Sequence, residues 1–108
     1  MGDEFERREE SFEKRFALSE ETRFKALARR NKLLGLWAAH LLGHQGDAAK
    51  AHADALVEAQ VGRGDDAALA AELGAQFSRA GIDLSPHRIA RKIDEAMAQA
   101  LDSIQAGR

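Results

Sequence analysis

Helix-breaking residues are few in this alanine- and leucine-rich chain, and their placement constrains the fold more than any other feature. The 108 residues include one proline, Pro86, and beyond residue 18 no strong helix breaker occurs before Gly43. Serine directly before a proline is a typical start of a helix, because serine caps the first turn and proline fits its first position. Alanine and leucine favour helices, and tyrosine, a strand former, is absent. The sequence therefore predicts an all-α protein.

Start and stop signals divide the chain after residue 18 into four predicted helices. Ser19 is a good N-cap, and Asp65 or Asp66 can cap a later helix after a glycine-containing loop. Gly43 and Gly81 are typical helix stops, since glycine readily adopts the backbone conformation that ends a helix. The predicted helices span residues 20–42, 46–61, 66–80 and 86–105.

Each predicted helix carries apolar side chains at helical spacing on one face. The residues expected in the core are Leu27, Leu34, Trp37, Ala38, Leu41, Ala49, Ala53, Leu56, Val57, Val61, Leu69, Leu73, Phe77, Ile89, Ile93, Ala96, Met97, Ala100, Leu101 and Ile104. Ile82 is placed to make the hydrophobic contact that often accompanies a glycine stop. Four amphipathic helices joined by short loops predict an antiparallel four-helix bundle. Many of the core positions are alanine, so we expect close approaches between helix backbones.

Composition excludes several classes of protein. No run approaches the roughly 18 apolar residues of a membrane-spanning helix, and the acidic start lacks the apolar segment of a secretion signal. The chain has no cysteine, which excludes a disulfide framework, a thiolate metal site and a cysteine nucleophile. These features fit a cytoplasmic protein. A net charge of −2 does not favour binding to nucleic acid.

No catalytic or metal-binding motif stands out. His40 and His44 have the i, i+4 spacing of a metal pair, but they lack an adjacent carboxylate, and Gly43 is expected to end the helix between them. The serines lack the context of a catalytic nucleophile, and Gly62 and Gly64 do not make a phosphate-binding loop. We therefore expect no enzyme activity, no metal site and no cofactor.

Residues 1–18 differ from the rest of the chain and are expected to form a separate, flexible segment before a bundle of residues 19–108. Phe5, Phe12 and Phe16 fall within roughly 40° of arc on a helical wheel. A lone helix of about 15 residues is marginal in water, so we expect the segment to be mobile when free and helical against a partner. The alternatives are a solvated charged tail and a loose extension of the first helix.

Charged side chains accompany the three phenylalanines. Glu9 lies about 40° from Phe5 on the same wheel, so a cation of the partner is expected to meet it. Arg7, Arg8 and Glu13 flank the aromatic stripe and are expected to tune recognition more than affinity. These residues and the three phenylalanines are the candidate partner-binding residues of the segment.

A basic stretch follows at the junction of the segment and the bundle. It consists of Arg23, Lys25, Arg29, Arg30 and Lys32. In a helix, Arg29, Arg30 and Lys32 spread over a wide arc and do not form one stripe. Residues 35–108 are also acidic overall, which disfavours nucleic acid as the partner. A basic docking collar suits an acidic protein surface better. A small nucleic-acid-binding regulator is kept as a distant alternative.

Residues 23–39 (RFKALARRNKLLGLWAA) closely resemble the first-helix signature of the ζ subunit family of α-proteobacterial F-type ATP synthases. This inhibitor family was once known only as a domain of unknown function. The residues FERRE at 5–9 and FEKRFA at 12–17 resemble the start of the family. The likeness continues through residues 41–43 and the four-helix layout, so it covers nearly the whole chain.

The resemblance implies a four-helix bundle whose mobile N-terminal segment enters a catalytic interface of the ATPase head, becomes helical and blocks ATP hydrolysis. The bundle is then an anchor on the outside of the head, and the role is similar to that of the mitochondrial inhibitor protein. It also implies a location peripheral to the membrane through the synthase, and we expect the free chain to be a monomer. Two positions depart from the family pattern: His40 stands where an acidic residue is expected, and Gln45 where a capping serine or threonine is expected. The loop Gly62–Asp66 is also more flexible than a tight turn needs. The main alternative is an adaptor that keeps the fold and binds another protein.

Overall fold

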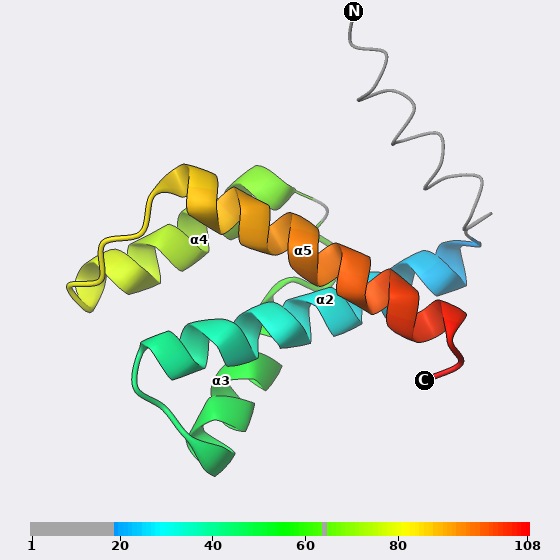
Figure 1. The fold of residues 1–108 in the computed structure, drawn as a ribbon, viewed down its shortest axis with the longest axis horizontal. Helices are drawn as coiled ribbons and strands as arrows, with labels where there is room; N and C mark the ends of the chain where they lie inside the picture. The colour runs from blue at the N-terminus through cyan, green and yellow to red at the C-terminus, as the bar shows by residue number, and fades with distance from the viewer. Residues whose placement is uncertain (1–18, 64) are drawn as a thin grey trace, which may run out of the picture.

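The computed structural model describes residues 19–63 and 65–108, and within them it contains four helices and no strand (Figure 1). The helices are α2 (Glu20–Leu41), α3 (Gly46–Ala59), α4 (Asp66–Arg79) and α5 (Pro86–Gln105). The all-α, four-helix prediction is confirmed, and every predicted helix end lies within two residues of the observed one. Helix α2 packs on α3 and on α5, and α4 packs on α5. Within the described residues, no helix has both the length and the apolar character required to cross a membrane.

Side-chain caps start three of these four helices. Ser19, Asp65 and Ser85 each accept a hydrogen bond from a backbone N–H two or three residues further on, at distances of 3.0–3.3 Å. Asp65, and not Asp66, is therefore the cap of α4. Gln45 precedes α3 without a side-chain cap. That helix consequently lacks the stabilisation of about 1 kcal/mol that a serine or threonine gives at this position.

Glycine ends α2 and α4 where the sequence predicts. Gly43 and Gly81 have φ angles of +91° and +74°, in the left-handed region. After Gly81 the N–H of Ile82 donates to the carbonyl of Phe77 at 2.8 Å, and the Ile82 side chain packs against the core. This combination of bond and contact determines the direction in which the chain leaves α4.

All four helices contribute to one hydrophobic core. Its buried members are Leu34, Ala38, Leu56, Leu69, Leu73, Phe77, Ile89, Ile93 and Ala96. Trp37 is half-buried against this cluster, and its ring meets the Phe77 ring edge to face, with centroids 5.3 Å apart. A smaller cluster joins Ala26, near the start of α2, to Leu101 of α5. The two clusters hold α2 and α5 together over several turns.

Two of the predicted core positions are wrong. Leu41 is 42% exposed and Val61 is 74% exposed. Leu41 is the last residue of α2, and its neighbour Leu42 packs against the core instead. Val61 lies beyond Ala59, where α3 ends, so it no longer follows the buried face of a helix. Every other predicted core residue is buried or half-buried.

Gly35 lies where α2 and α3 pack closely. A Cβ atom at this position would stand 2.5 Å from the Cα of Ala53 and 3.0 Å from its Cβ. A close-packed interior cannot absorb so short a contact without movement of one helix. The expected close approach of helix backbones is present here. It explains why a glycine stands inside a long helix in spite of its unfavourable helix propensity.

Candidate docking surface

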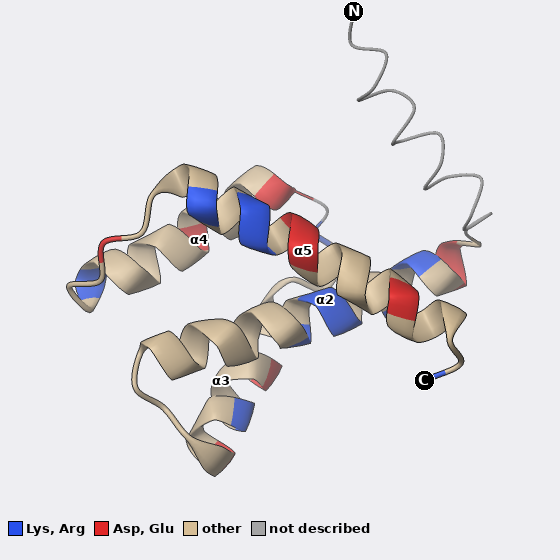
Figure 2. Cartoon of the chain, viewed as in Figure 1, with Lys and Arg blue, Asp and Glu red and all other residues tan. Residues whose placement is uncertain are grey.

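Basic positions occur at more than one place along α2 in Figure 2, and the residues predicted as a docking collar differ in their burial. Arg23 and Lys25 are exposed near the start of this helix, and Nζ of Lys25 forms a 3.8 Å ion pair with Oε1 of Glu21, one turn away. Lys32 is also exposed, whereas Arg29 is half-buried and Arg30 is buried. The structure therefore does not gather the five residues into one surface.

Arg30 lies inside the bundle, which corrects the interpretation of this residue as part of a docking collar. It is 5% exposed; its Nη1 donates to Oδ1 of Asp66 at 2.9 Å, and its Nε donates to Oδ1 of Asn31 at 3.0 Å. A guanidinium can be buried when its charge is paired and its donors are bonded. Asp66 is the first residue of α4, so this ion pair ties α2 to the start of α4.

Arg29 connects α2 with α5. Its Nη1 donates a hydrogen bond to Oγ of Ser103 at 2.7 Å, in a partly buried position. Within the part of the chain that the structure describes, Arg29 has no carboxylate partner. A guanidinium carries five N–H donors, so this one bond leaves donors for a further ligand.

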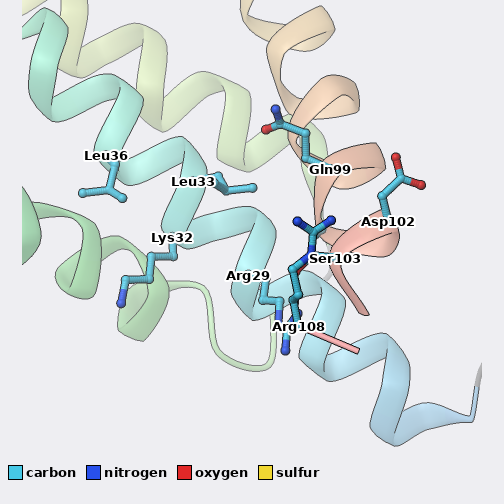
Figure 3. A pocket seen from close by; sticks show the side chains of 9 residues that line it. Arg29, Lys32, Leu33, Leu36, Gln99, Asp102, Ser103 and Arg108 are labelled. Carbon is cyan, nitrogen blue, oxygen red and sulfur yellow. The ribbon is translucent and has the colours of Figure 1, made fainter. Parts of the chain in front are cut away.

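Arg29 and Lys32 are among the residues that line an open groove between α2 and α5 (Figure 3). The groove has a volume of about 590 Å³. Leu33 and Leu36 of α2 and Ala100 of α5 contribute its apolar lining. In Figure 3 the Leu33 side chain points across the groove towards α5. Because Leu33 is 37% exposed, the groove presents apolar surface to solvent.

The charged part of the groove is mainly basic. Arg29, Lys32 and Arg108 line it, and Asp102 is the one acidic residue among the described residues that do so. The side chains of Lys32 and Arg108 have no ion pair or hydrogen bond with any other described residue. The groove is thus a basic site on a chain whose net charge is −2.

The i, i+4 spacing of His40 and His44 suggests that both rings lie on one helix, but the His44 ring contacts α3. Gly43 interrupts the helix between His40 and His44, and the His44 ring lies beside that of His52 in α3, with centroids 5.5 Å apart. Nε2 of His52 is in turn 3.1 Å from Oε1 of Gln76. In residues 19–63 and 65–108, no group of three or more histidine or acidic side chains is arranged to hold a metal ion.

The candidate partner-binding residues of the N-terminal segment lie outside the described residues. They are Phe5, Arg7, Arg8, Glu9, Phe12, Glu13 and Phe16. The described chain begins at Ser19, whose backbone is not helical, with φ of −58° and ψ of 156°. Helix α2 therefore has a defined start at Glu20.

The groove contains residues that the sequence interpretation did not assign to any site. Leu33 and Leu36 are three residues apart on α2. The basic residues Arg29 and Lys32, which precede them, have the same spacing. This second apolar pair, away from the core positions of the helix, is a signal that could have indicated another contact surface. Ser103 and Arg108 carry no such signal, because the packing of α5 on α2 is what brings them to the groove.

Four helices around a shared core, among the described residues, define the class of small helical-bundle proteins. Within that class, the family model described as ATPase inhibitor subunit zeta matches residues 2–103. The chain therefore belongs to the ATPase inhibitor subunit zeta family, and the resemblance seen in residues 23–39 is confirmed. No curated protein matches the chain.

Proposed function

We propose that this chain restrains ATP hydrolysis by an F-type ATP synthase. In this proposal residues 1–18 enter a catalytic interface of the head, become helical there and block turnover, while residues 19–108 hold the subunit on the outside. The observation that carries the proposal is the family match, because it spans residues 2–103 and so includes both parts. The chain acts as a non-catalytic regulator in the cytoplasm, peripheral to the membrane through the synthase.

The phenylalanines of the segment are its proposed anchors. Phe5, Phe12 and Phe16 stand at i, i+7 and i+11, the spacing with which an amphipathic helix fills a groove. Ordering a flexible segment costs free energy, which burial of large aromatic side chains offsets. Glu9 lies near Phe5 on the helical wheel and needs a cation from the head, because an unpaired carboxylate in a closed interface is costly.

The bundle supports this division of roles. Its core draws on all four helices, so residues 19–108 have the buried apolar surface of a self-sufficient domain. The side chain of Ser19 caps α2, which favours a boundary between the two parts at this point. A domain that folds alone can present a segment that becomes ordered only on its partner.

Hydrolysis by purified ATPase heads, assayed with and without the chain, tests the proposal. We expect the full chain to slow hydrolysis, and a variant that lacks residues 1–17 to stay folded and lose inhibition. Thermal unfolding followed by circular dichroism reports whether that variant is folded. A folded variant that still inhibits fully contradicts the role of the segment. A full chain that leaves hydrolysis unchanged contradicts the inhibitor role and favours the adaptor alternative.

A further inference from the structure

The groove between α2 and α5 combines the exposed side chain of Leu33 with three cations that form no ion pair with another described residue, which is unusual for a surface that meets only water. We infer that this groove docks an acidic amphipathic helix of the ATPase head. The inference rests on the proposed function and gives the bundle a contact of its own with the partner. The inhibitory segment and the groove then make two linked contacts, and such linkage strengthens binding by raising the effective concentration of each.

The shape of the groove suits a helix. Its two walls are themselves helices, and a third helix can pack into the space between two others as in any helical bundle. Leu33 and Leu36 contribute apolar side chains at a helical spacing to the α2 wall. Ala100, with its small side chain, leaves room for a partner at the α5 wall. Apolar residues of a partner helix at i, i+3 or i+4 can rest on this lining.

The charges that line the groove indicate that the partner helix is acidic. Arg29 and Lys32 are three residues apart on α2, so carboxylates one helical turn apart on a partner can meet both. Arg108 adds a third cation from the α5 side, and Asp102 adds one carboxylate that a partner N–H or cation can meet. Complementary charges of this kind guide association and set the orientation of the partner.

A protein helix fits the groove better than other anionic partners. Among the described residues that line the groove there is no aromatic ring on which a nucleic-acid base could stack. Asp102 repels a phosphate backbone, whereas a protein helix can pair this carboxylate with one of its own donors. The apolar lining also has no counterpart on a phosphate backbone but matches the apolar face of a helix.

Affinity for purified heads, measured by isothermal titration calorimetry with the full chain, tests the charge requirement. Lys32→Glu is expected to weaken binding at least tenfold. Lys50→Glu is the matched control, because Lys50 is an exposed lysine of α3 that does not line the groove. It is expected to change affinity less than about twofold. Thermal unfolding of both variants verifies that the fold is retained.

A second pair of variants tests the apolar lining. Leu33 and Leu41 are leucines of α2 with similar exposure, 37% and 42%, and of these two Leu33 lines the groove. Leu33→Ser is expected to weaken binding to the heads about fivefold or more, and Leu41→Ser to leave it nearly unchanged. Equal effects within either pair overturn the inference.

Measuring binding apart from hydrolysis distinguishes this inference from the proposed function. Heads that bind through the groove without being inhibited support the inference and contradict the inhibitor role. Inhibition that survives at unchanged affinity in Lys32→Glu and Leu33→Ser supports the inhibitor role and overturns the inference. Heads that do not bind the unaltered chain overturn both. A dimer of the chain alone that Leu33→Ser dissociates assigns the groove to a second copy and also overturns the inference.

Discussion

Replacing Gly35 with alanine should destabilise the bundle, even though alanine is the better helix former. The added Cβ would stand 2.5 Å from Cα and 3.3 Å from the carbonyl oxygen of Ala53. These are backbone atoms of α3, and they cannot turn away as the end of a flexible side chain can. Helix α3 must therefore shift as a unit, which loosens its packing on α2.

The magnitude follows from two opposing effects. Overpacking a core costs about 1–3 kcal/mol, and contact with backbone places this site at the upper end of that range. The gain in helix propensity from glycine to alanine is about 1 kcal/mol. The free energy of unfolding should therefore fall by about 2 kcal/mol. For a domain of this size, that loss lowers the melting temperature by roughly 10 °C.

Gly74 provides a matched control for this prediction. It lies inside α4, and a Cβ there would meet the side-chain Cδ1 of Ile89 at 3.7 Å, an ordinary contact. Gly74→Ala should therefore raise the free energy of unfolding by up to about 1 kcal/mol. Urea unfolding followed by circular dichroism measures both variants, and the two changes should have opposite signs. A Gly35→Ala variant as stable as Gly74→Ala would refute the close approach of α2 and α3.

Three further substitutions test the buried ion pair, the inhibitory segment and a helix cap. Arg30→Ala should lower the free energy of unfolding by about 2 kcal/mol, because two hydrogen bonds of a buried guanidinium are lost; an equal loss for the exposed Arg23→Ala in urea unfolding would contradict this. Phe12→Ala should weaken inhibition of hydrolysis at least tenfold, about 1.4 kcal/mol, and Glu6→Ala much less, whereas equal effects would indicate bulk charge. Ser85→Ala should cost about 1 kcal/mol in thermal unfolding, since α5 loses its cap, and an unchanged melting temperature would count against that contact.

The starts of α2, α4 and α5 could be predicted from the sequence because their side-chain caps join residues that are close in the chain. Ser85 and its bonded N–H are three residues apart, so the pattern alone contains the contact. Helix ends were predicted less well where no glycine follows at once. Helix α3 ends at Ala59, two residues before the predicted end, and Val61 consequently lies in the loop and is exposed. Local chemistry thus determines where helices begin more sharply than where they end.

Contacts between helices could not be predicted in the same way. A helical wheel shows which residues share a face but not which neighbour covers it. Gly35 therefore looks like a local cost until Ala53 is seen against it. Arg30 looks like a surface cation until Asp66 is seen beside its guanidinium. The groove has the same origin, because Arg108 reaches it only through the packing of α5 on α2.

The family signature and the proposed inhibitory residues lie in different parts of the chain, so substitutions can change inhibition and stability separately. Residues 23–39, which most closely resemble the family, lie wholly within α2. This helix packs on α3 and α5 and is ion-paired to α4, so substitutions in it affect the bundle as a whole. The residues proposed to inhibit hydrolysis lie instead in residues 1–18, before the cap of α2. Changes in the segment should therefore alter inhibition at constant melting temperature, whereas changes on the buried faces of α2 should alter both together.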